Sequence, residues 1–306
     1  MSDLIFAVMM MVAVAIFAFR LGLHWGRSES RGFRIKVQLL ALLLMGVYLA
    51  FLWNRPILSR LLPTSSLIIV GNWLPIWGCL FIGLYMSSPG TSLRRRVSLS
   101  LLTAVLAGYS TVAPILGKPP SCALVPAAKA LQQQTTPYTC SAASAASLLR
   151  IHGLDATESE LADLCLTRQG THWMGVYRGL SLKTRNSGWS VTAEPFTRDS
   201  LQHRNSGPCV LSFNVNPAGF ESSSDHGFVE GAGHSVLFLG SNGSGYVSVF
   251  DPAPEYGAEE WDDRMFNCIT DGVVLRLVPD DPDSPVALRV QRKLLMARNE
   301  VSLVLR

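Results

Sequence analysis

The sequence has little charge for its length. Of its 306 residues, 16% are charged and 48% are apolar, whereas roughly 25% of residues are charged in typical soluble domains. It contains no internal repeat and no low-complexity tract. The shortage of charge excludes a disordered chain or a coiled coil and favours a protein with segments embedded in a membrane.

Two motifs are also missing. The six cysteines include no Cys-x-x-Cys pair, so we expect no structural zinc site, and no metal or cofactor. No G-x-x-x-x-G-K-[ST] sequence is present, so the chain carries no nucleotide-binding module that could drive transport. The sequence leaves open whether Cys122, Cys165, Cys209 and Cys268 form disulfides.

The charge is divided unevenly along the chain. Residues 1–120 contain 11 Lys/Arg and 2 Asp/Glu, whereas residues 121–306 contain 15 Lys/Arg and 20 Asp/Glu. The positive excess therefore lies between apolar segments. We do not interpret it as nucleic-acid binding and expect the lipid bilayer to be its partner.

Four stretches are long and apolar enough to cross a bilayer, which takes about 20 residues. We predict a bundle of about four transmembrane helices within residues 1–117, at 4–25, 37–54, 67–86 and 97–117. Buried core helices are the alternative, but these usually have a polar face, which the four stretches lack. A cleaved signal peptide does not fit, because the only early charge is Asp3.

Lys and Arg in the short loops predict the orientation. Loops 26–36 and 87–96 together carry seven Lys/Arg, whereas loop 54–66 and Lys118 together contribute three. The first pair should therefore face the cytoplasm. This predicts a multi-pass protein of the cell membrane with both termini, and everything after residue 117, outside the cytoplasm.

The rest of the chain predicts one α+β domain. We expect a linker over 118–128, the domain over 129–280 and a basic tail over 281–306. Three helices should come first, at Ser141–His152, from Thr157 onward and over Trp173–Arg185. Five strands should follow, at Ser190–Ala193, Cys209–Asn214, Ser235–Gly240, Tyr246–Asp251 and Gly272–Leu277. Helices first and an antiparallel sheet afterwards is typical of α+β domains.

Cys140 differs from the other cysteines in its surroundings. It follows a turn containing Pro137 and begins a helix of very small residues. A thiol at a helix N-terminus has a lowered pKa, which favours the nucleophilic thiolate. The alternative is an ordinary buried cysteine at the start of a core helix.

A histidine and a carboxylate are predicted to meet on one hairpin. The turn Ser241–Gly245 joins the strand that His234 begins to the strand that ends at Asp251. If Gly240 pairs with Gly245 or Tyr246, His234 lies opposite Asp251 or Pro252. A cysteine nucleophile needs such a base and orienting carboxylate. An accidental pairing on a surface hairpin is the alternative.

Oxyanion stabilisation would require further hydrogen-bond donors. Gln134 lies six residues before Cys140 and can reach around the turn, with the Cys140 backbone N–H as a second donor. Gln132 and Gln133 are alternatives for this role.

These residues resemble a known family, the peptidase C39-like branch of the papain-like cysteine proteases. The resemblance covers about residues 129–278. Its motifs are Gln134 with Pro137-Tyr138-Thr139-Cys140-Ser141-Ala142-Ala143-Ser144, then Leu148-Leu149, Gly153, Glu160-Leu161 and Gly170-Thr171, and finally Gly233-His234-Ser235-Val236 and Asp251-Pro252.

The resemblance implies a papain-like fold with a site of four residues. Cys140 would be the nucleophile, His234 the general base, Asp251 its orienting partner and Gln134 the oxyanion donor. The best-known members remove leader peptides after a double glycine and are often fused to an ATP-driven exporter. This chain has Thr139-Cys140-Ser141 where the family commonly has Asp-Cys-Gly, and we do not carry over double-glycine specificity.

Our interpretation is a membrane-anchored cysteine peptidase that cleaves a peptide or protein, for example a leader or precursor, through a thioester acyl-enzyme. A separate exporter is a candidate partner. Two alternatives stay open: a catalytically silent papain-like domain that binds peptide or regulates a membrane partner, and an acyl or amide transferase using the same triad.

The orientation can be tested with reporters fused after Arg306. A reporter active only outside the cytoplasm should be active there, and one active only inside should be silent, because of the seven-to-three distribution of Lys/Arg. The opposite pattern would mean that one span has been miscounted and that the C-terminal domain faces the cytosol.

Overall fold

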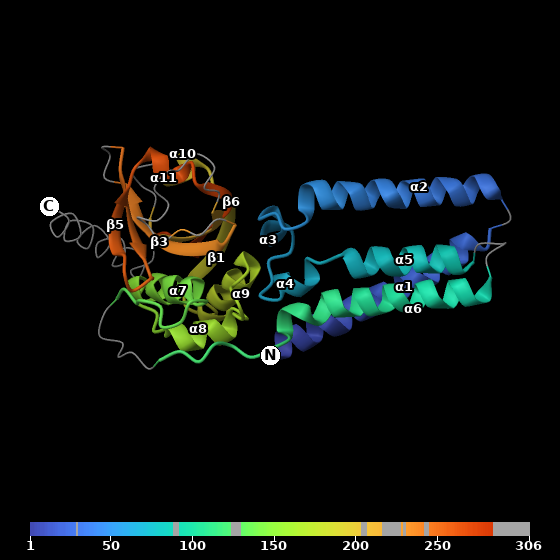
Figure 1. Cartoon of the computed structure of the whole chain (residues 1–306), viewed down its shortest axis with the longest axis horizontal. Coiled ribbons are helices and arrows are strands. Elements are labelled where there is room, and N and C mark those ends of the chain that lie inside the picture. Colours follow the sequence, from blue (N-terminus) through green and yellow to red (C-terminus); the bar gives the residue numbers. More distant parts are fainter. Residues whose placement is uncertain are drawn as a thin grey trace. The chain divides into compact units, whose positions relative to one another are not determined.

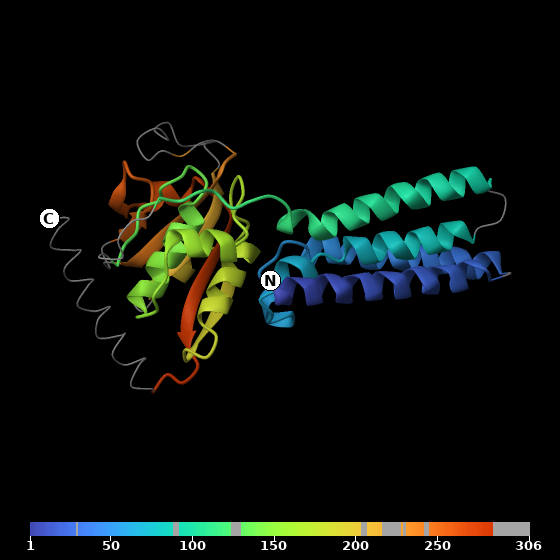
Figure 2. The ribbon, with the colours of Figure 1, turned by 90° about the horizontal axis from the view of Figure 1, so that it is seen from below.

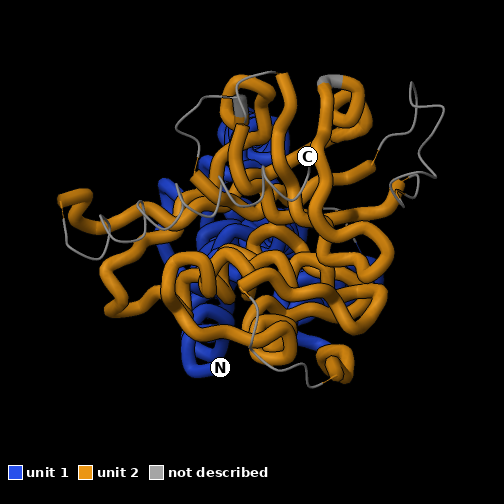
Figure 3. The backbone as a smooth tube through the Cα atoms, turned by 90° about the vertical axis from the view of Figure 1, so that its left-hand side faces the viewer, with its two compact units in different colours: residues 1–116 blue, residues 117–306 orange. Residues whose placement is uncertain are grey.

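The structure is a computed structural model that describes residues 1–28, 30–87, 92–123, 130–202, 207–215, 228, 231–241 and 245–283. The chain divides into two compact units, Met1–Leu116 and Gly117–Arg306 (Figure 3). The first unit is helical and the second combines helices with a sheet (Figure 1).

Among the described residues of the first unit, four helical segments are long and apolar enough to cross a membrane, the number predicted. They are Ser2–Gly26, Arg31–Leu52, Leu67–Met86 and Leu93–Ile115. The first is the single helix α1 (Ser2–Gly26). The second is α2 (Arg31–Val47) continued by a π-helical turn (Tyr48–Leu52), and the fourth is α6 (Leu93–Val112) continued by a 3₁₀ turn (Ala113–Ile115).

The ends of two helices differ from the prediction. The second and fourth helices begin at Arg31 and Leu93, earlier than the predicted residues 37 and 97. Basic residues assigned to loops, including Arg34 and Arg95, therefore lie in the first turns of helices. Hydropathy predicts only the apolar part of a helix, whereas the hydrogen-bonded backbone of the helix extends into the charged residues that flank this part.

The third span is interrupted. A short helix α3 (Ile57–Leu61) precedes it, and the span consists of α4 (Leu67–Val70) and α5 (Leu74–Met86). The Tyr48 hydroxyl donates to the Gly71 carbonyl at 2.8 Å and accepts from the Trp73 N–H at 3.0 Å. One side chain thus satisfies two of the backbone groups released at the break, as an apolar environment requires.

Helices α1 and α5 cross at two glycines. A Cβ atom at Gly22 would lie 2.3 Å from the Leu80 carbonyl oxygen, and one at Gly83 would lie 2.3 Å from the Phe19 carbonyl oxygen. Small residues allow two helices to approach this closely and to gain van der Waals contact. In lipid such packing drives helix association, because the hydrophobic effect contributes little between helices there.

The described residues of the second unit form a six-stranded antiparallel sheet. Its strands are β1 (Trp189–Pro195), β2 (Cys209–Val215), β3 (Gly233–Ser241), β4 (Val247–Asp251), β5 (Gly257–Trp261) and β6 (Ile269–Pro279). Their order in the sheet is β1-β6-β2-β3-β4-β5, and every neighbouring pair is antiparallel. The predicted order, helices first and antiparallel sheet afterwards, is confirmed.

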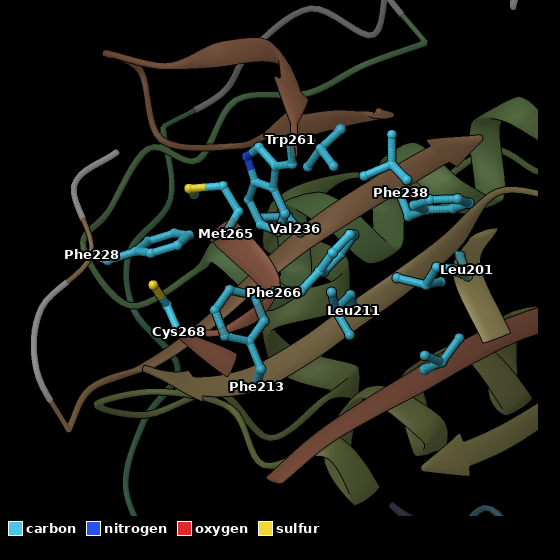
Figure 4. Packing of buried hydrophobic residues seen from close by; sticks show 14 of the residues in the cluster. Leu201, Leu211, Phe213, Phe228, Val236, Phe238, Trp261, Met265, Phe266 and Cys268 are labelled. Carbon is cyan, nitrogen blue, oxygen red and sulfur yellow. The ribbon is translucent and has the colours of Figure 1, made fainter. Parts of the chain in front are cut away.

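Helices cover both faces of this sheet. On one face lie α7 (Cys140–Ile151), α8 (Glu158–Leu164) and α9 (Trp173–Lys183) (Figures 1 and 2). On the other face lie α10 (Arg198–Gln202) and α11 (Asp263–Phe266) (Figure 1). Their side chains complete a buried apolar cluster with Phe213, Phe228 and Trp261 (Figure 4).

Two features of the sheet were not predicted. Strand β5 was missed because its sequence, Gly-Ala-Glu-Glu-Trp, has little apolar character. The β3–β4 register was wrong: Gly240 pairs with Ser248, and a bulge lies between Phe238 and Gly240. Such an extra residue cannot be counted from the turn alone. Residues 242–244 of the predicted turn, 124–128 of the linker and 284–306 of the tail lie outside the described residues.

Gly83→Ala tests the α1–α5 crossing. We expect the full chain in detergent to lose about 1–3 kcal/mol of unfolding free energy, because the new methyl group cannot fit against the Phe19 carbonyl. The matched control is Gly108→Ala in α6, where a Cβ would meet nothing within 4 Å. Thermal unfolding checks both variants, and equal effects would contradict the crossing.

Candidate active site

Cys140 is the first residue of α7, and Thr139 precedes it at the N-cap position. The following residues, Ser141 to Leu149, are all buried, so the helix is held in the interior of the domain. As a residue, Cys140 itself is partly exposed. This matches the predicted position of a thiol at a helix N-terminus, where unpaired N–H groups favour the thiolate.

The pKa of Cys140 is lowered, although burial acts to raise it. Hydrogen-bond and charge interactions with His234 outweigh the burial, and the Ser235 backbone and the Ser141 side chain act in the same direction.

The other thiols of this unit behave in the opposite way. Burial raises the pKa of Cys165 and of Cys209 to about 12, and it also raises the pKa of Cys122 and Cys268. All six cysteines are free thiols in this structure. Among the cysteines of the second unit, all of them described, Cys140 is therefore the one suited to act as a nucleophile.

His234 lies beside Asp251, as the hairpin predicted. His234 Nε2 is 2.7 Å from Asp251 Oδ2, and the side chains are 19% and 1% exposed, respectively. The other carboxylate oxygen, Asp251 Oδ1, accepts from the Ala253 N–H at 2.8 Å. Burial lowers the pKa of His234, but the hydrogen bond to Asp251 and the interaction with Cys140 outweigh it and raise this pKa.

The strand register that brings these two side chains together differs from the predicted one. Leu237 pairs with Phe250, and this register continues to place Asp251 opposite Val236, two residues from His234. Such a diagonal pair lies on one face of a sheet, within reach of a long side chain. His234 also packs against Phe213 and Phe228, at ring-centroid distances of 5.9 and 5.7 Å.

Gln134 is tied to the segment that follows Asp251. Its backbone N–H donates to the Pro252 carbonyl at 2.7 Å, and its side-chain oxygen is buried without a hydrogen-bond partner among the described residues. Of the two alternatives, Gln133 is exposed and its side-chain amide donates to Pro254. Gln132, like Gln134, has a buried side-chain oxygen without a described partner.

Glu158 supports the segment between Gln134 and Cys140. It is fully buried at the start of α8. Its Oε1 accepts from the Thr135 N–H at 2.7 Å and from the Thr139 hydroxyl. In the sequence, Glu158 lies only at the start of the helix predicted from Thr157 onward, where Thr157 accepts from the Glu160 N–H. Glu158 lies 23 residues from Thr135, so no local sequence pattern indicates that its carboxylate supports this segment.

The serines of α7 were also missed as site residues. Ser141 and Ser144 hydrogen-bond to Ser235, the residue after His234, and Ser147 accepts from the Gln132 N–H at 2.8 Å. In the sequence they stand out only as very small residues of the predicted helix. The signal available in the sequence was a hydroxyl at every third position of an otherwise apolar helix.

The other described histidines of the second unit have different partners. His152 hydrogen-bonds to the Leu148 carbonyl through Nδ1 at 2.8 Å, and His172 caps α9 by accepting from the Met174 N–H. Burial lowers the pKa of both, that of His172 to about 4. His203 and His226 lie outside the described residues. Among the described residues no cluster of His, Cys, Asp and Glu could hold a metal ion.

The arrangement combines a thiol at a helix N-terminus, an imidazole and a buried carboxylate. A thiol can transfer its proton to such an imidazole, and the carboxylate stabilises the charged ring that results. The product is a thiolate beside an imidazolium, which can attack a carbonyl carbon.

Comparison with known proteins gave structural matches only. No protein-family model and no curated protein matches the sequence. The peptidase domain of Streptococcus ComA, described as a bifunctional ABC transporter in a quorum-sensing pathway, is 19% identical with a TM-score of 0.39. That match covers 49% of this chain and 97% of the other. The peptidase domain of Streptococcus mutans ComA is 15% identical with a TM-score of 0.33, covering 49% and 100%.

Limiting iodoacetamide tests the reactivity of Cys140. In the full chain near pH 7 we expect Cys140 to be alkylated before the other thiols. Its pKa lies below the ordinary value whereas the pKa values of Cys122, Cys165, Cys209 and Cys268 lie above it. Peptide mass spectrometry identifies the labelled residue.

His234→Ala is the control for this experiment. It should slow the labelling of Cys140 near pH 7 and leave the other cysteines unchanged, because His234 lowers the pKa of Cys140. Faster labelling of Cys165, Cys209 or Cys268, or an unchanged rate in His234→Ala, would contradict the assignment.

Proposed function

We propose that the protein is a membrane-anchored cysteine peptidase that hydrolyses peptide bonds through a thioester intermediate. One arrangement carries the proposal: Asp251 holds His234 at 2.7 Å, and Cys140, a partly exposed residue at a helix N-terminus, has a pKa that His234 lowers. A peptide or protein is the substrate in this proposal.

In the first half of the reaction, the Cys140 thiolate attacks the carbonyl carbon of the scissile bond. The negative charge develops on the carbonyl oxygen, where the Gln134 side-chain amide and the Cys140 backbone N–H are the proposed donors. His234, which holds the thiol proton, gives it to the departing nitrogen as the carbon–nitrogen bond breaks. An amine leaves, and a thioester to Cys140 remains.

In the second half, water attacks the thioester. His234 takes a proton from this water, and the carbon–sulfur bond then breaks to release the acid. Sulfur departs as a thiolate and His234 is left as an imidazolium, so the starting ion pair is restored. Asp251 stays ionised throughout and keeps the ring oriented.

The buried side-chain oxygen of Gln134 supports its assignment as the oxyanion donor over Gln133. An amide presents two donors and one acceptor. Its segment is tied to Pro252 on one side and, through Thr135, to Glu158 on the other. These contacts would keep the amide in position before the charge develops.

The setting of the proposed peptidase is the cell membrane. Four apolar helices among the described residues could cross the bilayer, and the distribution of Lys and Arg supports a domain outside the cytoplasm. A leader or precursor peptide that has reached that side is a suitable substrate. The given residues contain no P-loop motif, and a separate exporter is a candidate partner in this proposal.

Asp251→Asn in the full chain tests the triad. In the native site one oxygen of Asp251 accepts from His234 and the other from the Ala253 N–H. Asparagine has one oxygen and can serve only one of these donors. Turnover of a peptide substrate should therefore fall by tens- to thousands-fold, a transition-state cost of roughly 2–4 kcal/mol.

Asp163→Asn is the matched control. Asp163 is exposed on α8, and an exposed substitution usually changes stability by less than about 0.5 kcal/mol. This variant should keep full turnover. Undiminished hydrolysis in Asp251→Asn would remove Asp251 from the triad. A wild-type protein that binds peptides without cleaving them would support the silent domain, and acyl transfer to an added amine in preference to water would support the transferase.

A further inference from the structure

The two donors proposed for the oxyanion come from opposite ends of one short segment. Gln134 supplies a side-chain amide, and Cys140 supplies the backbone N–H at the start of α7. The N–H groups in the first turn of a helix have no partner within that helix. Two donors stabilise one developing charge well only if both point at it before it forms. The two ends of this segment must therefore be fixed relative to each other.

One carboxylate oxygen contacts both ends of the segment. Glu158 Oε1 accepts from the Thr135 N–H at 2.7 Å and from the Thr139 hydroxyl. Thr135 directly follows Gln134, and Thr139 directly precedes Cys140. The oxygen of Glu158 thus bonds to the residue beside each proposed donor.

Thr139 transmits this contact to α7. Its hydroxyl has a single hydrogen and two described acceptors, Glu158 Oε1 and the Thr136 carbonyl at 3.0 Å. Of the two, the carboxylate is the stronger acceptor. The Thr139 carbonyl accepts from the Ala143 N–H at 2.9 Å, in the first turn of the helix. Glu158 and α7 therefore hold the residue before Cys140 from two sides.

The Gln134 end of the segment is also held at two points. The Gln134 N–H donates to the Pro252 carbonyl at 2.7 Å, and the next N–H along the chain, that of Thr135, donates to Glu158. The contact with Pro252 does not involve Glu158. Removal of the carboxylate would therefore loosen this end and release the bond that links it to the other end.

The burial of Glu158 is costly. Glu158 and Thr139 are both 0% exposed. A fully buried carboxylate is rare unless it is paired, because it loses its solvation by water. The hydrogen bonds from Thr135 and Thr139 compensate for part of this loss. A buried charge is weak evidence for a contribution to stability, and the position of this one supports a role in placing the segment.

We propose that Glu158 is a positioning residue of the proposed site and aligns its two oxyanion donors, Gln134 and Cys140, with each other. Its loss should impair attack on a carbonyl group, in which an oxyanion forms, and spare reactions of the thiol in which none forms. The proposal rests on the proposed function in one respect, that Gln134 and Cys140 supply the oxyanion donors.

Two reagents that react with the same thiol separate these effects in the full chain. Iodoacetamide is attacked at a saturated carbon, so a carbon–sulfur bond forms, iodide leaves and no oxyanion develops. The ester p-nitrophenyl acetate is attacked at its carbonyl carbon, so an oxyanion develops, p-nitrophenolate leaves and an acetyl thioester to Cys140 remains. Peptide mass spectrometry measures the alkylation. Release of p-nitrophenolate, less the release by Cys140→Ala, measures the acylation.

Glu158→Met keeps the length of the side chain and removes its acceptor. Acylation should slow by about 10- to 100-fold, because outright removal of one oxyanion donor costs about 100- to 1,000-fold and here the donors are only misplaced. Alkylation at neutral pH should keep its rate, since the variant retains His234, which lowers the pKa of Cys140 against the effect of burial. Glu158→Gln, which keeps one acceptor oxygen for both bonds, should restore acylation.

A pair of variants at Thr139 decides the question should Glu158→Met fail to fold. Valine lacks the hydroxyl that reaches Glu158, whereas serine keeps it. Thr139→Val should slow acylation less than Glu158→Met does, since the bond from Thr135 remains, and Thr139→Ser should acylate at nearly the wild-type rate. Equal acylation by the two Thr139 variants would contradict the proposal.

Glu160→Met is the matched control, since Glu160 lies on the same helix and its exposed carboxylate pairs with Lys183 at 2.8 Å. An exposed ion pair contributes little to stability, so both reactions should keep their rates. The positioning role would be overturned by unchanged acylation in Glu158→Met. A parallel loss of both reactions in a folded Glu158→Met, checked by circular dichroism, or an equal loss of acylation in Glu160→Met would also overturn it.

The outcome for the proposed function is separate. Selective loss of acylation in a protein that cleaves no peptide would reject the peptidase and retain the role of Glu158. Normal peptide hydrolysis by Glu158→Met would do the reverse. A wild-type chain in which the ester never acylates Cys140 would reject the pair of oxyanion donors, and the positioning role with it.

Discussion

The site depends on the close packing of α7 against β3. This helix consists almost entirely of alanine, serine and leucine, and its residues from Ser141 to Leu149 are buried. Because most of these side chains are small, the helix can approach the sheet until its hydroxyls reach the backbone of Ser235. The same approach brings Cys140 to His234, and Ser147 holds the segment of Gln132 and Gln134. A larger residue on this face would separate the thiol from its base.

Part of this arrangement could be predicted from the sequence. Apolar length predicted four spans, and the turn after Gly240 predicted the hairpin that brings His234 to Asp251. The register failed because a bulge adds a residue to β3. The roles of Glu158 and Ser235 could not be predicted, since each bonds to a residue far along the chain, 94 positions away in the case of Ser141 and Ser235.

The two units differ in how their backbone N–H and C=O groups obtain hydrogen-bond partners. In the first unit, the Tyr48 hydroxyl completes the broken third span, and glycines bring α1 against α5. In the second unit, the N-terminus of a helix lies at the proposed site. The N–H groups at the start of α7 have no partner within the helix, and that is where the thiol lies. An unpaired backbone group is a cost in the first unit and part of the proposed site in the second.

Because Cys140 and His234 are far apart along the chain, the thiol and its base are synthesised at different times. Ribosomal synthesis delivers the cysteine well before the histidine and the strand that ends at Asp251. Until β3 and β4 join the sheet, the sulfur lacks the ring and the amide that lower its pKa, and it is an ordinary thiol. A nascent chain therefore carries an ordinary cysteine, and the lowered pKa arises only when β3 and β4 have been added. The timing of the proposed activity is thus set by topology, with no separate inhibitory segment required.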